Sequence, residues 1–327
     1  MGYTLGILDQ SPLMGNATNE QIIGMTVDLA QKAENWGYSR FWVSEHHNTP
    51  ELIGSSPEVL ASYLLAKTKT IKIGSGGVML QHYSPYKVAE NFNLLSTLAP
   101  GRVDLGVGKA PGGLPLSTKA LQHGTINDGS DFDNRLKELQ QYVKGYGEVI
   151  AVPVPKTAPR LVLLGASAKS AELAGQLGIG FVFAGFINTS LEVLQEAATL
   201  YKKHHPAGHF AVGMAVMAAD TADEAKSLAV GKKLVKVHLD SGRTLTVADM
   251  EMGHQFGKES GEGYTLKEFD ANIFHGTAAD VHTLFETYHE RFKIDEFILH
   301  TPILNAAARE RSFELLSPKF SAKVRVA

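Results

Sequence analysis

The sequence predicts an α/β fold, a (β/α)8 barrel in which each of eight parallel strands is followed by a helix. Short apolar runs alternate with amphipathic segments along the chain, and eight strand–helix units can be counted. Neither a G-x-G-x-x-G pattern after the first strand nor a G-x-x-x-x-G-K-[ST] pattern is present, so the usual fingerprints of open-sheet nucleotide binders are missing. Right-handed crossovers keep the strands parallel, and eight of them close a barrel. We therefore favour the closed barrel over an open doubly wound sheet.

Each element has a local signal in the sequence. Strands are expected at short apolar runs, at residues 3–8, 40–44, 71–74, 103–107, 160–164, 179–183, 210–215 and 296–300. Helices are expected where apolar residues recur with a helical period, at residues 19–36, 57–67, 85–98, 133–146, 167–177, 189–204, 221–239, 277–292 and 305–316. Gly37 is placed to end the first helix in the left-handed conformation, and Thr221 is placed to begin another.

Two long polar stretches interrupt this alternation, at about residues 108–131 and 241–276. Both show no sustained period, and both contain glycine. Loops of this length inside a compact domain are usually functional or disordered. We expect a single domain over residues 1–327, with the two stretches as insertions at the C-terminal face of the barrel and as candidate lids over a site.

The composition argues against several classes of function. The formal net charge is -3 and the charges are scattered, so no basic stripe indicates nucleic acid and no basic amphipathic segment indicates a membrane surface. The chain contains no cysteine, which excludes disulfides, thiolate metal sites and a cysteine nucleophile. No signal peptide and no uncharged apolar run of ~18 residues is found. We expect a cytoplasmic protein that acts on a small molecule.

The most informative stretch is residues 41–48, where an apolar strand ends in Glu45, His46 and His47. Parallel α/β folds keep their ligand sites at the carboxyl ends of the strands. Neighbouring strand residues point to opposite sides, so the two imidazoles should not enter one pocket, and we expect no metal site. A hydrogen-bonded structural role and a role as proton donor or acceptor are both open for a single histidine here.

Two further strand ends carry glycines or hydroxyl groups. Gly76-Gly77 follows the third strand, where the glycines either allow a turn or let the backbone approach a ligand. Residues 165–170 join the fifth strand to a helix, so Ser167 and Ser170 either cap that helix or hold a phosphate at its N-terminus. Lys109, which we expect on the facing side of the same barrel mouth, would supply the counter-charge to a phosphate.

Several of these stretches are similar to a known family. The chain resembles the bacterial luciferase-like flavin-dependent monooxygenase family over nearly its whole length, and is most similar to its single-chain members. The matching stretches are residues 42–47, 74–80, 89–95, 101–109 and 167–178. The resemblance implies a TIM-type barrel that binds reduced FMN, delivered by a separate flavin reductase, and uses dioxygen as co-substrate to oxidise an organic molecule.

The resemblance also implies roles for single residues. His46 would be the acid–base group near the flavin, with Glu45 and His47 supporting it. Gly76-Gly77 would be the pair that a non-proline cis peptide joins beneath the flavin ring.

A second group of matching residues would hold the cofactor. Lys109 matches a basic residue that pairs with the FMN phosphate in the family. Gly165, Ser167 and Ser170 match the strand end and helix start that hold the same phosphate.

The function expected from this resemblance is an FMN-dependent monooxygenase acting on an aldehyde, ketone, amine or sulfur compound. One alternative is an oxidoreductase that uses a deazaflavin for hydride transfer, and another is a non-catalytic flavin-binding protein. The resemblance further implies a homodimer packed through the helices at residues 57–67 and 85–98. Tyr63, Leu64 and Phe92 are the apolar anchors that we expect to be exposed there.

Overall fold

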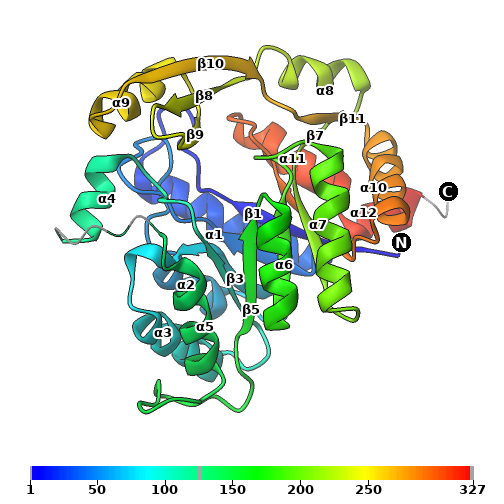
Figure 1. Ribbon diagram of the computed structural model, residues 1–327. Coiled ribbons are helices and arrows are strands. Elements are labelled where there is room, and N and C mark those ends of the chain that lie inside the picture. Colours follow the sequence, from blue (N-terminus) through cyan, green and yellow to red (C-terminus); the bar gives the residue numbers. More distant parts are fainter. Residues whose placement is uncertain (1, 124–126, 128, 325–327) are drawn as a thin grey trace.

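Eight parallel strands close a barrel in the computed structural model, which describes residues 2–123, 127 and 129–324 (Figure 1). The strands follow one another around the ring in chain order, and the eighth pairs with both the first and the seventh. They are β1 (Thr4–Asp9), β2 (Arg40–Val43), β3 (Lys72–Met79), β4 (Val103–Gly108), β5 (Arg160–Gly165), β6 (Gly180–Ala184), β7 (Phe210–Ala218) and β12 (Glu296–His300). The predicted (β/α)8 barrel is therefore confirmed.

The helices around the barrel begin and end at residues with a clear physical role. Thr18 starts α1 through a reciprocal capping box with Gln21, and Gly37 ends it in the left-handed conformation at φ 87°. The surrounding helices are α1 (Asn19–Trp36), α2 (Pro57–Lys67), α3 (Pro85–Leu98), α5 (Phe132–Val143), α6 (Ala168–Leu177), α7 (Leu191–His204), α10 (Ala278–Phe292), α11 (Ala306–Leu316) and α12 (Pro318–Val324), with a 3-10 turn η1 (Leu80–His82). Of the described helices, none has the length and apolar character to cross a membrane.

The chain between β7 and β12 differs from the prediction. The helix expected over residues 221–239 is wrong beyond its first half, because α8 (Ala222–Ala229) ends early and a strand, β8 (Lys233–Leu239), follows. In β8 the fully buried side chains are Val235, Val237 and Leu239. A spacing of two is the period of a strand, so the sequence did carry the signal.

The two predicted insertions contain regular structure that the sequence did not reveal. Within residues 108–131 lies α4 (Pro115–Leu121). Within residues 241–276 lie β9 (Thr244–Val247), α9 (Met250–Ser260), β10 (Tyr264–Asp270) and β11 (Phe274–Gly276). β8, β9 and β10 form an antiparallel sheet in the order β10-β8-β9, and β11 pairs with the end of β7.

The two insertions pack against each other. Leu114, just before α4, is buried in the apolar core of the inserted sheet with Val235 and Phe256. The backbone N–H of Leu116 donates a hydrogen bond to Glu259 of α9 at 3.0 Å. Figure 1 shows the inserted sheet and α9 lying across one end of the barrel. The insertions therefore form one continuous cover.

In six of the eight barrel strands, all except β3 and β4, alternate residues belong to two separate apolar layers. One set fills the barrel interior: Leu8, Trp42, Val162, Val182, Ala211 and Ile298. The other set, which includes Phe41 and Phe297, packs outward against the helices. Because the side-chain period of a strand is two, this division also fixes which residues at the strand ends face the barrel mouth.

At the opposite end, the barrel floor holds a buried charged cluster. Arg40 donates to the carboxylates of Asp104 and Glu296, the latter at 2.8 Å. Trp42 Nε1 donates to Asp104 at 2.9 Å, and His209 Nε2 donates to Glu296 at 2.9 Å. Burial alone would raise the pKa of Glu296, but the hydrogen bond from His209 and the charge of Arg40 lower it to about 2. The cluster therefore keeps the Glu296 carboxylate ionised inside the protein.

Candidate active site

The barrel mouth carries polar side chains on one side and small residues on another. Counting in steps of two from the interior residues of β1, β2 and β12 places Gln10, His46 and His300 on the interior side. We call these three residues the polar arc, which is continuous because the three strands are neighbours. The corresponding positions on β3 and β4 are Gly76 and Gly108. On β3 and β4, therefore, no side chain projects from these positions, and at Gly108 the adjoining space is open.

His46 is oriented by Gln10. The amide Nε2 of Gln10 donates to Nε2 of His46 at 3.2 Å. Because an amide nitrogen can only donate, this ring nitrogen accepts, and the neutral ring carries its proton on Nδ1. Burial lowers the pKa of His46 to about 4, with a further lowering by His47 and an opposing effect of Glu45. His46 is therefore neutral near pH 7 and can exchange a proton with a ligand.

Glu45 and His47 point away from the mouth, into the wall between β2 and β3. Glu45 is 1% exposed, and its Oε1 accepts hydrogen bonds from His47 Nε2 and the Tyr83 hydroxyl, each at 2.7 Å. Its Oε2 accepts from the backbone N–H of Met79 at 3.0 Å. Of the three titratable groups predicted here, only His46 reaches the mouth. Across the described part of the chain, no three carboxylate or imidazole groups are placed to hold a metal ion.

The same wall holds the loop that follows β4. The backbone N–H of His47 donates to the carbonyl of Gly112 at 2.8 Å. His82 Nε2 donates to the carbonyl of Pro111 at 2.7 Å. Because this loop begins at Lys109, these bonds set where that lysine leaves the barrel.

Gly76 and Gly77 lie within β3, where its pairing with β4 shifts register between Ser75 and Val78, and the peptide between them is cis. A Cβ atom on Gly76 would meet Leu8 Cδ1 at 2.7 Å, and one on Gly77 would meet the backbone of Gly106 at 2.8 Å. Neither position can therefore carry a side chain without displacing the barrel wall. By contrast, a Cβ on Gly108 would meet nothing within 4 Å, so open space adjoins the neighbouring strand end.

Lys109, Ser167 and Ser170 follow β4 and β5, and we call them the phosphate cradle. These strands are neighbours, so the expectation that Lys109 lies on the facing side of the mouth is wrong. The Lys109 side chain lies against Gly129, in the loop that follows β4. Ser167 caps α6 by accepting from the Ser170 N–H at 3.2 Å, and the two hydroxyl oxygens lie 3.0 Å apart. Gly165 is required because a Cβ there would meet that of Ser170 at 2.5 Å. Lys109 is exposed and forms no ion pair with any described residue.

His300 is a site residue to which the sequence analysis assigned no role. Its Nδ1 atom is buried and has no hydrogen-bond partner in the described structure. Burial lowers the pKa of His300 to about 4, Arg309 lowers it further, and Asp9 raises it. Arg309 in turn donates to Asp9 Oδ1 at 2.9 Å. The available signal was its position at the end of the eighth strand, which did not show that it would lie near His46.

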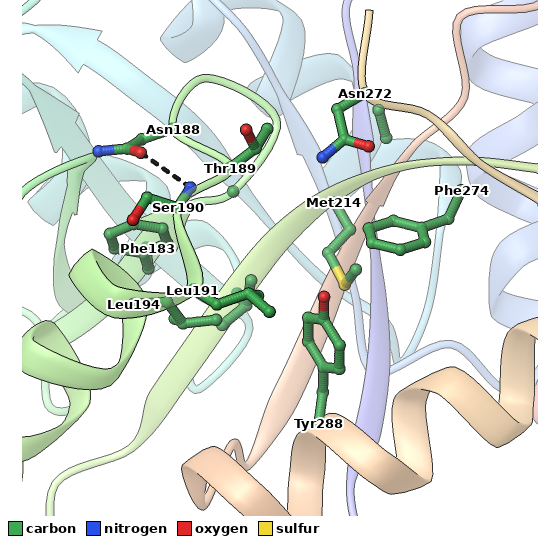
Figure 2. A pocket seen from close by; sticks show the side chains of 13 residues that line it. Phe183, Asn188, Thr189, Ser190, Leu191, Leu194, Met214, Asn272, Phe274 and Tyr288 are labelled. Atoms are coloured by element: carbon green, nitrogen blue, oxygen red, sulfur yellow. Dashed lines mark hydrogen bonds between the residues drawn. The ribbon is translucent and has the colours of Figure 1, made fainter.

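A separate hollow lies on the outer side of the barrel wall (Figure 2). Leu191 and Leu194 of α7, Phe274 of β11 and Tyr288 of α10 line it. Met214 also lines it and belongs to the outer apolar layer, so the wall separates this hollow from the polar arc. Its cavity volume is about 30 Å³, which has room for water but not for an organic substrate. This hollow is therefore not a candidate for the substrate site.

Comparison with known proteins identifies relatives of the whole chain. A family model described as luciferase-like monooxygenase matches residues 4–292. N-acetyl-S-alkylcysteine monooxygenase of Bacillus subtilis strain 168 is 45% identical over 323 residues, which cover 96% of this chain and 97% of the relative.

Solved structures share the fold. Apo-MsnO8 matches with a TM-score of 0.79 and 27% identity, over 98% of each chain. The oxygenating constituent of 3,6-diketocamphane monooxygenase from Pseudomonas putida, solved in complex with FMN, matches with a TM-score of 0.72 and 19% identity, over 99% of each chain. These matches confirm the resemblance drawn from the sequence motifs. The protein is an oxidoreductase of the monooxygenase type, and the chain belongs to the luciferase-like monooxygenase family.

Proposed function

We propose that the protein is an FMN-dependent monooxygenase that uses reduced FMN and dioxygen to oxidise a small organic substrate. The observation that carries this proposal is the composition of the barrel mouth, where the neutral imidazole of His46 and the phosphate cradle flank glycine-lined space. A flat ring needs small neighbours, and a phosphate needs N–H donors and positive charge. An uncharged imidazole can accept a proton as a general base.

The residues present fit an FMN molecule. The first-turn N–H groups of α6, the hydroxyls of Ser167 and Ser170, and Lys109 would hold its phosphate. Gly108 would lie against its ring, because open space adjoins it, and the backbone of Gly76-Gly77 would approach the ring without a side chain of its own. Bound flavin would supply the electrons with which dioxygen is activated.

The protein's own groups would orient the reactants and move protons. Gln10 would hold the His46 ring in one orientation, with its Nδ1–H available as a hydrogen-bond donor to a ligand. The cover formed by the two insertions would exclude water from the mouth, which strengthens electrostatic interactions and suppresses side reactions. Glu45, through its bonds to His47 and Met79, would keep the end of β2 in place and act as a positioning residue.

We further propose a thioether as the substrate, because the relative at 45% identity is named for N-acetyl-S-alkylcysteine. One atom of dioxygen would enter the substrate and the other would leave as water, with two electrons coming from reduced FMN. The test is to mix the protein with reduced FMN, N-acetyl-S-methylcysteine and ¹⁸O₂, and to analyse the product by mass spectrometry. We expect one ¹⁸O atom in the product.

Three results would contradict this function. Turnover with a reduced or oxidised deazaflavin alone, without dioxygen, would indicate a hydride-transfer oxidoreductase. Flavin binding without substrate-dependent oxygen use would indicate a non-catalytic flavin-binding protein. Incorporation of ¹⁸O from labelled water instead of dioxygen would exclude a monooxygenase reaction.

Replacing Lys109 by Met is expected to weaken FMN binding about tenfold, as for the loss of one charge-assisted hydrogen bond. Riboflavin lacks the phosphate, so its affinity should not change. Quenching of flavin fluorescence measures both dissociation constants. The matched control is Lys119→Met on the exposed side of α4, which should alter neither. Equal weakening of both flavins would show that Lys109 acts on the fold of the loop instead.

We also propose that a separate flavin reductase supplies the reduced FMN and that the protein is a homodimer packed through α2 and α3. Large exposed apolar side chains on these helices support the dimer, since such patches mark interfaces: Val59, Tyr63, Leu94 and Leu98. Of the three anchors expected from the sequence, Tyr63 is exposed, but Leu64 and Phe92 are buried and were wrong choices. In sedimentation velocity, we expect a dimer for the unaltered chain and a monomer for Leu98→Glu.

A further inference from the structure

We propose that His300 and Gln10 form a subsite that binds the carboxylate of the substrate, on the side of the barrel mouth opposite the phosphate cradle. This inference rests on the function proposed above and deepens it. It requires the substrate to be an anionic thioether, in which an apolar S-alkyl part and a carboxylate are recognised separately.

The first support is an unsatisfied polar atom. His300 Nδ1 is buried and has no hydrogen-bond partner among the described residues. Ser44, which precedes His46 by two positions on the same interior side, carries a second such atom in its Oγ. Buried polar atoms in folded proteins are almost always hydrogen-bonded. Asp9 Oδ2 is a third such atom, but Asp9 lies on the outer side of β1 with Ile7 and pairs with Arg309. The unsatisfied atoms of His300 and Ser44, on the two strands that flank β1, therefore indicate that a polar group of the ligand completes them.

The second support is the placement of the subsite around the ring. The phosphate cradle follows β4 and β5, whereas Gln10 follows β1 and His300 ends β12. In the closed ring, β1 lies four strands from β5 in either direction. A flavin held by its phosphate at the cradle would extend its ring into the mouth towards the polar arc. The substrate would then lie between the flavin ring and the pair formed by Gln10 and His300.

The third support is the sign of the local charge. The polar arc contains N–H donors and no carboxylate, because the acids on the same strand ends face outward. Asp9 pairs with Arg309 at 2.9 Å, and Glu45 pairs with His47. The charged and titratable groups that act on His300 are Arg309, Asp9 and His46, and Arg309 has the largest effect of the three. The Arg309 guanidinium is only 5% exposed and is neutralised by Asp9, so this ion pair leaves no net negative charge on this side of the mouth to repel an anion.

The fourth support is an apolar neighbour for the rest of the substrate. The rings of Phe186 and His300 lie 5.9 Å apart between centroids. Phe186 and Leu164 both pack against the interior apolar cluster. An S-alkyl chain could therefore lie on Phe186 while the carboxylate meets the imidazole and the amide. A neutral ligand would gain the apolar contact but not the charge-assisted hydrogen bonds.

The test compares two substrates with the same thioether: N-acetyl-S-methylcysteine and its primary amide. For His300→Leu, we expect KM for the acid to rise about 10- to 100-fold, the loss expected for hydrogen bonds to a charged group. KM for the amide should change less than about threefold on the same reasoning. His300→Asn keeps an amide donor and should recover part of the loss in KM for the acid. Gln10→Leu should also reduce the preference for the acid over the amide. The control is His238→Leu, an exposed imidazole of the inserted sheet.

The binding of flavin and of substrate separates the possible failures. FMN affinity in each variant should match that of the unaltered chain, and circular dichroism should show a folded barrel. Equal losses for acid and amide, or a loss of FMN binding in His300→Asn, would overturn the subsite. If the unaltered chain oxygenates neither compound, calorimetric titration of each compound into the FMN-loaded protein measures whether the acid binds more tightly than the amide. Tighter, His300-dependent binding of the acid then supports the subsite although the proposed function has failed, and equal binding overturns both.

Discussion

Replacement of His46 by Asn is expected to lower kcat about 10²- to 10⁴-fold, the range for loss of one acid–base group. The side chain lies at the mouth, is oriented by Gln10 and is uncharged near pH 7. An amide can keep a hydrogen bond to Gln10 but cannot exchange a proton. The loss should therefore appear in kcat and leave FMN affinity within about twofold. Steady-state product formation with reduced FMN, dioxygen and a thioether measures it.

The pH dependence provides a second check on His46. Because burial lowers its pKa to about 4, protonation should not reduce activity between pH 8 and pH 6. A loss of activity with an apparent pKa near 6.5 in the unaltered chain, absent from His46→Asn, would show that the ring is not held neutral. His238→Asn, on the exposed face of β8, serves as the matched imidazole control. If His46→Asn retains full kcat, a group other than His46 carries out the proton transfer.

Replacement of Asp104 by Ala is expected to cost about 3–5 kcal/mol of unfolding free energy, because it leaves a buried guanidinium without one of its partners. Asp104 accepts from Arg40 and Trp42 in the barrel floor and is 1% exposed. Urea unfolding followed by tryptophan fluorescence measures the change. Asp220→Ala removes an exposed partner of Arg311 and should leave the unfolding midpoint almost unchanged. Similar midpoints for the two variants would contradict a stabilising role of the cluster.

The same cluster predicts how the protein responds to acid. Glu296 has a pKa of about 2 in the folded chain, below its ordinary value of 4.5. The unfolded chain therefore binds more protons between these values, and stability falls as the pH drops through this window. The pKa values of His46 and His300 are lowered from 6.5 to about 4. Protonation of these two imidazoles therefore also reduces stability as the pH falls, in the window between 6.5 and about 4. Glu296→Gln should reduce stability at pH 7 and flatten the dependence below pH 4.5.

The barrel could be predicted because each of its elements has its own local signal. Strand runs such as β12 have an apolar centre, here residues 297–299, and helices such as α6 and α10 begin at capping residues, Ser167 and Thr277. The closure of the barrel could be predicted by counting eight strand–helix units in the sequence. None of these inferences needed information about contacts between distant residues.

The insertions were predicted poorly because helix and strand signals there compete over short distances. The capping signal at Thr221 is real and starts α8, but the chain leaves the helix before Gly231. The alternating pattern of β8 follows after only three residues, and the predicted helix wrongly includes it. In α9, Asp249 and Gly261 cap the two ends, yet only eleven residues lie between them, too few for a strong period.

The site, like the fold, has residues that could be predicted from the sequence and residues that could not. His46 was predicted from strand alternation together with family resemblance, and the structure places it at the mouth. The partners of His46 could not be predicted, because Gln10 reaches it through the register between β1 and β2. His300 belongs to the same arc only because the eighth strand returns beside the first. Such contacts arise from barrel closure, which leaves no mark in local sequence.

The shared core of the two insertions limits how new specificities can be engineered. Leu114 belongs in sequence to the segment after β4, yet it is buried in the sheet formed after β7. Grafting the later insertion from a homologue without residues 114–116 would leave a cavity in the transplanted sheet and break its bond to Glu259. The unit of exchange in a chimera is therefore the pair of segments, moved together. Because Lys109 lies five positions before Leu114, such a chimera should be screened for flavin retention as well as for substrate range.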